Sequence, residues 1–272
     1  MPELPEVETV VNHLVENITG KTILSLSSPN NYHKVFSGKS IGECNRFIQH
    51  QSIEKIYRRG KYILLSLSKG FISIHLRMTG KLLVNLHNSS ELKYVSAQFH
   101  FDDDTSLHFM DVRKFGRIIC SENLDYLENK LGIEPLSQHF TPHWLQSQLP
   151  TKNRQMKPLL LDQSFIVGLG NIYVDEALWL AEIHPNSISS NITQKNCEKL
   201  CKVIKQILLN AIQLNGTSFQ SFSYGNNSLG SYIDKLNIFG KNGLPCPRCH
   251  TLIQKIKVAQ RGTHFCPKCQ RL

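Results

Sequence analysis

The sequence lacks the features of membrane and secreted proteins. Its 272 residues contain no long apolar run, and the chain opens on Pro and Glu residues where a secretion signal would have basic and then apolar ones. We find no internal repeat. We therefore expect a cytoplasmic protein. Because 40% of its residues are apolar, a chain of this length can build the cores of two domains.

The C-terminal half is poor in acidic residues. Residues 151–272 hold 15 Lys and Arg against 6 Asp and Glu, a net charge of +9, whereas residues 1–150 hold 16 against 15, a net charge of +1. A basic half attracts polyanions, and without a lipidation motif nucleic acid is a better candidate partner than a membrane. A basic face that meets only solvent is the alternative.

Cysteine is sparse outside the C-terminal segment. Four residues are scattered through the chain: Cys44, Cys120, Cys197 and Cys201. Without a secretion signal we do not expect disulfides, and these side chains are best interpreted as small buried apolar groups.

The other four cysteines form two CxxC pairs, Cys246 with Cys249 and Cys266 with Cys269, separated by sixteen residues. This spacing is typical of a zinc ribbon. Four thiolates fill a tetrahedral site and leave no position for a substrate, so the sequence predicts one structural zinc ion.

The segment between the CxxC pairs alternates apolar and polar residues and predicts a β-hairpin over residues 252–265. Arg261 lies at or near its turn, with Lys255 and Lys257 along it. The alternative is a turn arginine that only faces solvent, but a rigid, metal-clamped basic hairpin is well suited to binding phosphates.

Residues 21–120 alternate apolar and polar residues in short stretches separated by turns, which favours a sandwich or barrel. The expected strands are residues 21–26, 53–57, 62–67, 71–76, 82–86, 98–101, 107–110 and 117–120. The period then changes, and helices are expected at residues 141–149, 157–163, 172–181 and 193–214. We interpret residues 217–231, rich in Ser, Gly and Asn, as a mobile functional loop.

The N-terminus could carry a nucleophile. A small second residue favours removal of the initiator Met, which would leave Pro2 with a secondary amine near Glu3 and Glu6. An α-amino group loses its proton near neutral pH and can attack a sugar carbon with help from a nearby acid. The same residues also describe a capped amphipathic helix that ends at Gly20, and the segment alone favours that alternative.

Other side chains are suggestive only as a set. Lys61 precedes a strand, Met78, Arg113 and Phe115 lie in loops beside strands, and Asn171 follows a Gly-containing turn at a helix N-terminus. A loop Met and an Arg near a Phe could fill a gap in a base stack, and a helix N-terminus can bind an anion. Taken singly, each is more often a packing or surface residue.

Together these segments resemble the formamidopyrimidine-DNA glycosylase family from end to end. The likeness is carried by Met1 to Val10, Arg59-Gly60-Lys61-Tyr62, His75-Leu76-Arg77-Met78-Thr79-Gly80, Asp111-Val112-Arg113-Lys114-Phe115-Gly116, Leu160 to Asn171, and the cysteine pairs with Gln260-Arg261.

The resemblance implies a two-domain α+β protein. Its parts would be an N-terminal helix with an antiparallel β-sandwich (residues 1–130), a helical helix-two-turn-helix region (131–238) and a four-cysteine zinc finger (239–272). The implied activity is that of a monomeric DNA glycosylase and AP lyase. It would remove 8-oxoguanine and formamidopyrimidines from double-stranded DNA, nick by beta and delta elimination, and need no cofactor besides zinc.

The resemblance also implies residue roles. Pro2 would attack C1′, Glu3 would donate a proton, Lys61 would act as a general acid, and Arg261 would assist the second elimination. The expected DNA contacts are Met78, Tyr94, Arg113, Phe115, Lys152, Lys157 and Asn171.

The chain departs from the family pattern in three places that bear on substrate preference. Tyr94 and Ser96 lie where a His is usual, Phe239 replaces a Tyr, and the loop from Ser221 lacks a usual Lys. Two alternatives remain open. One is an endonuclease VIII-like enzyme for oxidised pyrimidines, which Leu4 together with Met78, Arg113 and Phe115 argues against. The other is a non-catalytic zinc-ribbon DNA-binding protein, which would leave Pro2, Glu3 and Lys61 without a purpose.

Overall fold

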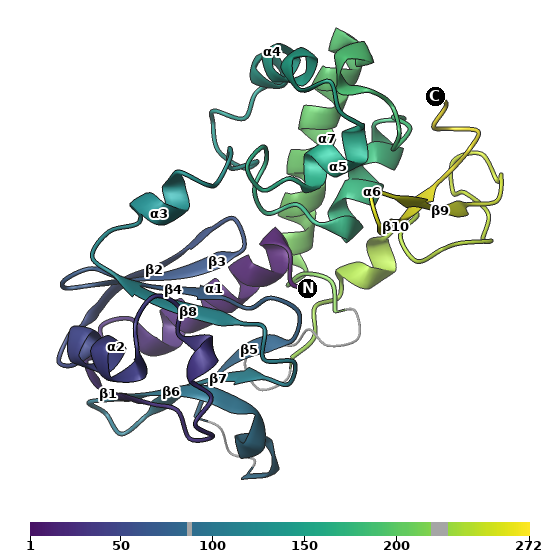
Figure 1. The fold of residues 1–272 in the computed structure, drawn as a ribbon. Helices are drawn as coiled ribbons and strands as arrows, with labels where there is room; N and C mark the ends of the chain where they lie inside the picture. The colour runs from purple at the N-terminus through teal and green to yellow at the C-terminus, as the bar shows by residue number, and fades with distance from the viewer. Residues whose placement is uncertain (86–88, 219–227) are drawn as a thin grey trace. The chain divides into compact units, whose positions relative to one another are not determined.

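The computed structural model describes residues 1–85, 89–218 and 228–272 (Figure 1). Most of the loop expected at residues 217–231, including the segment from Ser221, lies outside these described residues. The chain divides into two compact units. Unit 1 comprises residues 1–129 and 214–231, and unit 2 comprises residues 130–213 and 232–272.

Unit 1 begins with helix α1, Leu4–Ile18, as the N-terminal pattern predicts. Glu3 is its N-cap and forms a capping box with Glu6, and Pro5 lies in the first turn, where its missing N–H costs nothing. The apolar residues recur at helical spacing and are buried against strands β2 (Ile53–Arg59), β3 (Tyr62–Leu67) and β5 (Gly80–Val84). The predicted amphipathic helix is therefore confirmed.

Two four-stranded antiparallel sheets complete unit 1, in the orders β1-β6-β7-β5 and β2-β3-β4-β8. The strands are β1 Ile23–Ser27, β2 Ile53–Arg59, β3 Tyr62–Leu67, β4 Phe71–His75, β5 Gly80–Val84, β6 Val95–Phe101, β7 Ser106–Asp111 and β8 Arg117–Ser121. One apolar cluster takes side chains from α1 and from both sheets, among them Leu14, Ile63 and Phe99. The predicted sandwich is confirmed. Each expected strand is present, residues 62–67 with the same bounds and the others with one or both ends shifted by up to three residues.

The sequence interpretation missed helix α2, Ile41–Ile48, in the stretch that it expected to be mostly β. The Ser40 hydroxyl accepts a hydrogen bond from Glu43 N, and the Glu43 carboxylate accepts one from Ser40 N. This Ser-x-x-Glu capping box was the available signal. Shorter helical turns occur at η1 His33–Val35, η2 Ser89–Tyr94 and α3 Asp125–Glu128.

Unit 2 is helical, as predicted. Its helices are α4 Pro142–Lys152, α5 Met156–Leu161, α6 Asn171–Leu180 and α7 Gln194–Gln213, with short turns η3 Ser189–Asn191 and η4 Tyr232–Lys235. Helix α7 buries Cys197, Leu200, Ile204 and Leu208, one stripe at helical spacing, and packs against α4 and α6. Within the described ranges no helix is long and apolar enough to cross a membrane.

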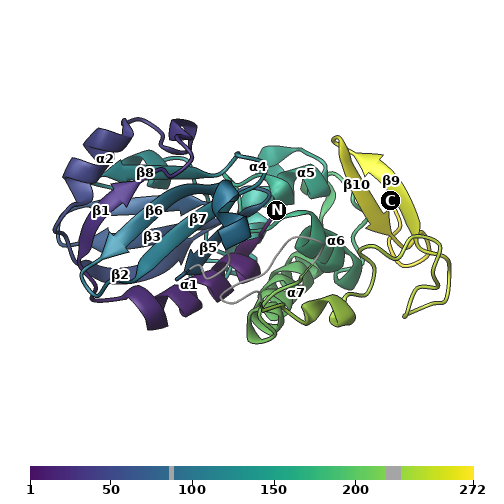
Figure 2. The same ribbon diagram turned by 90° about the horizontal axis from the view of Figure 1, so that it is seen from below.

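The predicted hairpin is also present, as strands β9 Gln254–Val258 and β10 Arg261–Phe265 (Figure 2). Arg261 pairs with Val258, so a two-residue turn joins the strands. Both turn residues, Ala259 and Gln260, have positive φ, of 44° and 63°. The turn thus has the type I′ pattern that matches the twist of a hairpin.

Candidate functional site

The N-terminus of α1 lies in buried surroundings. Pro2 is buried, and Glu3 and Glu6 are only 3% and 2% exposed. Glu6 Oε2 accepts a hydrogen bond from Glu3 N at 2.8 Å, and Glu6 Oε1 accepts one from Thr217 N at 2.7 Å. Glu6 therefore joins the beginning of the chain to the segment that returns to unit 1 at residues 214–231.

Charged groups surround the N-terminal amine, which belongs to Met1 in this structure. Burial lowers the pKa of this amine below its ordinary value of 8.0, and the cations Lys61 and Arg113 lower it further, against the opposing effect of Glu3 and Glu6. A lower pKa increases the neutral, nucleophilic fraction at neutral pH. These surroundings suit a reactive amine with acids beside it.

Lys61 is the second residue of the turn between β2 and β3, and it is 5% exposed. Gly60 precedes it with φ 58°, the left-handed conformation that a tight hairpin needs at this position. Arg58 holds this turn to α1, because its Nε donates to Glu8 Oε2 at 2.6 Å and its Nη1 donates to Gly60 O at 3.0 Å. The Glu8–Arg58 pair thus places Lys61 relative to the helix that carries Glu3, and sequence reasoning did not find it.

His75 is a further polar residue that the sequence interpretation did not select as a site residue. It is 7% exposed at the end of β4, and its Nδ1 accepts a hydrogen bond from Arg77 N at 3.0 Å. Its ring packs edge-on against the Tyr62 ring, with the two ring centres 4.6 Å apart. Burial, with Arg77 and Lys61 nearby, lowers the pKa of His75 to about 3. Its imidazole is therefore neutral at physiological pH. The sequence did offer one indication of its importance, because His75 is the first residue of the segment His75 to Gly80 that carries the family resemblance.

Met78, Arg113 and Phe115 lie on two loops of unit 1 that both reach the same buried carboxylate, Asp111. Met78 is 39% and Phe115 49% exposed, which is unusual for large apolar side chains, and Arg113 is also exposed. The Arg113 guanidinium lies 5.1 Å from the centre of the Phe115 ring. The loops therefore present apolar and cationic groups to solvent.

Tyr94 ends the η2 turn and is half-buried. It packs against Leu83, Val95 and Met110, and the Lys93 ammonium lies 5.1 Å from the centre of its ring. Its role as a DNA contact stays a prediction.

In unit 2, Lys157 is fully buried. Its Nζ forms an ion pair with Asp175 Oδ1 at 2.6 Å and donates to Gly262 O at 3.0 Å. The other oxygen of Asp175 accepts a hydrogen bond from His264 N at 2.9 Å. Lys157 therefore faces the β10 strand that carries Arg261, rather than solvent, in this structure.

Asn171 begins α6 and reaches the same strand, because its Nδ2 donates to Gly262 O at 3.0 Å. One backbone carbonyl thus binds Asn171 and Lys157, and the residue before it is the exposed Arg261. Lys152 is exposed in the last turn of α4. The structure brings Lys157, Asn171 and the Arg261 strand together, while Lys152 stands apart from these bonds.

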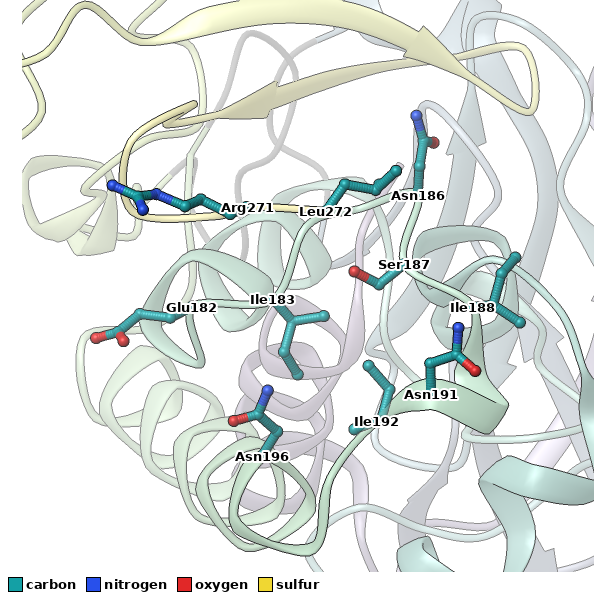
Figure 3. Close-up of a pocket in the computed structure, with 10 residues that line it drawn as sticks. All are labelled: Glu182, Ile183, Asn186, Ser187, Ile188, Asn191, Ile192, Asn196, Arg271 and Leu272. Atoms are coloured by element: carbon teal, nitrogen blue, oxygen red, sulfur yellow. The ribbon is translucent and has the colours of Figure 1, made fainter.

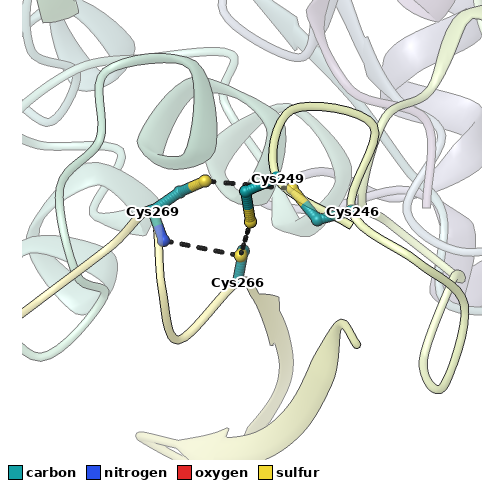
Figure 4. A group of neighbouring side chains, drawn as sticks. All are labelled: Cys246, Cys249, Cys266 and Cys269. Carbon is teal, nitrogen blue, oxygen red and sulfur yellow. Dashed lines mark hydrogen bonds between the residues drawn. The ribbon is translucent and has the colours of Figure 1, made fainter. Parts of the chain in front are cut away.

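The four C-terminal cysteines gather at one point, and all their sulfur atoms lie within 4.8 Å of one another (Figure 4). Cys246 Sγ lies 3.9 Å from Cys269 Sγ, and Cys249 Sγ lies 3.4 Å from Cys266 Sγ. Tetrahedral zinc with Zn–S bonds of about 2.3 Å requires sulfurs about 3.8 Å apart. The donor set fits one structural zinc ion, as the sequence predicts.

Glu176 on α6 fixes the approach to the zinc finger. Its carboxylate accepts hydrogen bonds from the backbone N–H groups of Asn237, Ile238 and Phe239 at 2.8 to 3.0 Å. The Phe239 ring in turn meets His264 edge-on at 5.1 Å. Sequence reasoning missed Glu176 because an acidic residue within a helix carries no local mark of a buried anion.

Unit 2 also contains a cavity of about 350 Å³ away from these groups. Figure 3 shows it between the segment of residues 182–196 and the last two residues of the chain. Its walls combine isoleucine side chains with the amides of Asn186, Asn191 and Asn196. None of the predicted site residues lines it.

Three family models match the chain in sequence. Residues 1–118 match the formamidopyrimidine-DNA glycosylase N-terminal domain, residues 131–223 match the formamidopyrimidine-DNA glycosylase H2TH domain, and residues 243–272 match the zinc finger found in FPG and IleRS.

Full-length relatives agree with these matches. The chain is 39% identical over 277 residues to a formamidopyrimidine-DNA glycosylase from Pelotomaculum thermopropionicum, and 41% identical over 283 residues to one from Protochlamydia amoebophila. Both alignments cover 100% of each chain.

The fold is similar to solved structures of the same kind. A Lactococcus lactis FPG mutant bound to DNA containing Fapy-dG superposes with a TM-score of 0.92 at 36% identity, and MutM bound to DNA containing carbocyclic 8-oxo-G with 0.91 at 37% identity. Each covers 100% of both chains.

Proposed function

The chain belongs to the formamidopyrimidine-DNA glycosylase family, and from this we propose that it is a DNA glycosylase and AP lyase that removes oxidised purines from double-stranded DNA. The basic C-terminal half supports a DNA partner, and we propose that the protein acts in the cytoplasm on chromosomal DNA. The observation that carries the proposal is that Pro2, Glu3 and Lys61 are all buried at the start of α1, where burial also lowers the pKa of the adjoining Met1 amine.

The proposed chemistry begins at Pro2 once Met1 has been removed. The amine nitrogen attacks C1′ of the damaged nucleotide, the bond from C1′ to the base breaks, and the base leaves with a proton. The proposed proton donors are Glu3 and Lys61, whose charges act on the pKa of the adjoining Met1 amine. The C1′–O4′ bond then breaks as a proton is delivered to O4′, and the sugar ring opens to an iminium between the amine and C1′. Loss of a proton from C2′ expels the 3′ phosphate (beta elimination), and loss of a proton from C4′ expels the 5′ phosphate (delta elimination). Hydrolysis of the remaining conjugated iminium releases the sugar and the enzyme, which leaves a one-nucleotide gap.

The proposed roles of unit 2 are to bind and position the DNA. Arg261 and Asn171 bind the phosphate that flanks the lesion, and Arg261 assists the second elimination. Lys152 contacts the DNA backbone. Lys157 remains a proposed DNA-path residue, and its bonds to Asp175 and Gly262 support a role in holding the Arg261 strand. Zinc, when bound, supplies order to the finger and takes no part in the chemistry.

The proposed role of Met78, Arg113 and Phe115 is to occupy the gap left when the damaged nucleotide is flipped out of the duplex. Large apolar side chains that stay exposed are suited to enter a base stack, and an arginine can donate to the orphaned base. Tyr94 is proposed as a further contact with the DNA.

The test is borohydride trapping on a duplex that contains 8-oxoguanine opposite cytosine. We expect a covalent adduct whose DNA is attached to the N-terminal peptide, identified by mass spectrometry. Glu3→Gln should lower excision by about 100-fold, the range of a lost general acid. Glu16→Gln, an exposed substitution on the same helix, is the control. A wild-type protein that forms no adduct with 8-oxoguanine or abasic duplexes would contradict the proposal.

The departures at Tyr94 and Phe239 make lesion preference a separate question. Excision of 8-oxoguanine should exceed that of thymine glycol if the oxidised-purine assignment holds. The opposite order would instead support an endonuclease VIII-like preference while leaving the chemistry at Pro2 in place.

A further inference from the structure

The loops that carry the candidate gap-filling residues belong to different strand connections. Met78 lies between β4 and β5, and Arg113 and Phe115 lie between β7 and β8. Each loop contains a residue with left-handed backbone, Arg77 with φ 55° and Lys114 with φ 58°. Non-glycine residues hold this conformation only where the surrounding structure determines it.

One buried carboxylate joins the two loops. Asp111, the last residue of β7, is 1% exposed. Its Oδ1 accepts hydrogen bonds from Thr79 Oγ1 at 2.5 Å and from Arg113 N at 3.1 Å, and its Oδ2 accepts one from Gly116 N at 2.7 Å. Thr79 belongs to the Met78 loop, whereas Arg113 and Gly116 flank Phe115. The Asp111 carboxylate therefore bonds to both loops at once.

Two neighbouring contacts tighten this arrangement. Arg113 N also approaches Thr79 Oγ1 at 3.2 Å, so the two loops contact each other directly beside the carboxylate. Gly116 is required, because a Cβ at this position would lie 2.3 Å from the Phe109 ring and 3.2 Å from Asp111 Oδ2. A larger residue would push the backbone N–H away from its acceptor.

We propose that Asp111 is a positioning residue that holds Met78 in fixed relation to Arg113 and Phe115, so that the three enter the gap beside a flipped nucleotide as one unit. This inference rests on the proposed function. Because Asp111 is only 1% exposed, its side chain does not contact the DNA in this proposal but acts through the two loops to which it is hydrogen-bonded. Holding these loops before DNA binds avoids the entropy of ordering them afterwards.

The direct test is Asp111→Asn, which keeps the shape but replaces one acceptor oxygen with an NH2 group. That group cannot accept from Thr79, Arg113 or Gly116. We expect excision of 8-oxoguanine from a duplex to fall by 10-fold or more. A 2-aminopurine beside the lesion should show brighter fluorescence than with wild type, because the gap is then filled less often.

Chemistry at the amine is measured separately by borohydride trapping on single-stranded DNA with an abasic site. This substrate has no opposite strand and therefore no base-pair gap to fill. We expect Asp111→Asn to retain trapping within about two-fold. Asp104→Asn makes the same chemical change at an exposed turn residue with φ 63° and serves as the matched control.

A second pair of variants protects the test against misfolding of Asp111→Asn. Thr79→Val removes the hydroxyl that donates to Asp111, and Thr79→Ser keeps it. We expect the valine variant to lose duplex excision and the serine variant to retain it.

Three outcomes would overturn the inference. If both Asp111→Asn and Thr79→Val excise 8-oxoguanine and change the 2-aminopurine fluorescence as wild type does, the carboxylate does not position the loops. Equal losses on duplex and single-stranded DNA would assign Asp111 to general stability or to chemistry. A wild-type protein inactive on every substrate would overturn the proposed function, and this role with it.

Discussion

The neutral imidazole of His75 has a measurable consequence at the scale of a single residue. Its pKa in the folded protein is about 3, whereas an unfolded histidine titrates near 6.5. As the pH falls below 6.5 the unfolded chain binds a proton that the folded chain does not, so the folded state loses stability. The loss approaches about 1.4 kcal/mol per pH unit.

His75→Asn isolates this effect, because asparagine can still accept the hydrogen bond from Arg77 N. We expect the free energy of unfolding in urea to fall more steeply for wild type than for His75→Asn between pH 6.5 and pH 4.5. Parallel curves for the two proteins would contradict the buried neutral state.

Single residues also show where sequence reasoning ended. The cysteine quartet could be predicted because its spacing alone determines the metal geometry. His75 and Asp111 were not selected, because the Tyr62 ring that packs on His75 and the Thr79 hydroxyl that donates to Asp111 come from other strands and loops. The family resemblance implied a DNA contact at Lys157, which stays a prediction, and only the structure shows that its charge is paired with Asp175, 18 residues away.

At the scale of elements, the turn of the β9–β10 hairpin is less stable than it could be. Ala259 and Gln260 adopt positive φ, which asparagine and glycine tolerate better. We expect Ala259→Asn combined with Gln260→Gly to raise the free energy of unfolding of the zinc-bound protein by about 1 kcal/mol. Thermal unfolding measures this change.

A glycine placed inside a strand of the same hairpin should lower the free energy of unfolding rather than raise it. Lys255→Gly, at an exposed position inside β9, should lower the free energy of unfolding by about 0.5–1 kcal/mol, since glycine weakens strand interiors. If the double substitution at the turn is also destabilising, the turn is not of type I′ in solution.

The zinc finger and helix α6 share a small apolar cluster in which Trp179 packs with Cys246 and Cys266. Removing zinc should loosen this cluster and expose the indole. In Trp144→Phe, which leaves Trp179 as the one tryptophan of the two in the sequence, we expect a chelator to shift the emission to the red and to weaken DNA binding about 10-fold or more.

Cys266→Ser should reproduce both effects without chelator, because it removes one zinc ligand. Undiminished DNA affinity after confirmed loss of zinc would contradict a structural role for the metal in binding.

The elements themselves were largely predictable. Strands and helices with strong periodicity were predicted, because an element that buries one face has apolar residues at a regular spacing. Helix α2 was missed because only Cys44 and Ile48 of its eight residues are buried, so its apolar pattern is weak. Its capping box was the stronger signal.

At the scale of the whole molecule, the chain leaves unit 1 near residue 129 and returns to it at residues 214–231. The return is secured at Glu6, whose carboxylate accepts from Thr217 N. Gly216 is next to this contact with φ 79°, and a Cβ there would lie 2.8 Å from Glu6 Oε1. A side chain at position 216 would therefore displace Glu6 and disturb the N-terminus that carries the proposed chemistry.

We expect Gly216→Ala to lower the free energy of unfolding by about 2 kcal/mol, combining an unfavourable φ with the clash at Glu6. Gly20→Ala is the matched control, since Gly20 has φ 84° but nothing within 4 Å of a Cβ. Only the Gly216 variant should also slow adduct formation. Equal effects of the two variants on stability would mean that Glu6 moves away without cost.

The sequence by itself determined the zinc site, the alternation of the two sheets, the amphipathic helices and the basic C-terminal half. Each of these depends on spacing or composition within a short segment, which the chain displays directly. The N-terminal segment alone favoured an ordinary capped helix, and that helix is present.

Only the tertiary structure decided what surrounds the beginning of α1. It brought Lys61 and Arg113 near the amine, tied the Lys61 turn to Glu8 through Arg58, and joined two loops at Asp111. The physical reason is that burial, charge–charge distance and shared hydrogen bonds depend on positions in space. Residues far apart in the sequence set these quantities, and no local pattern records them.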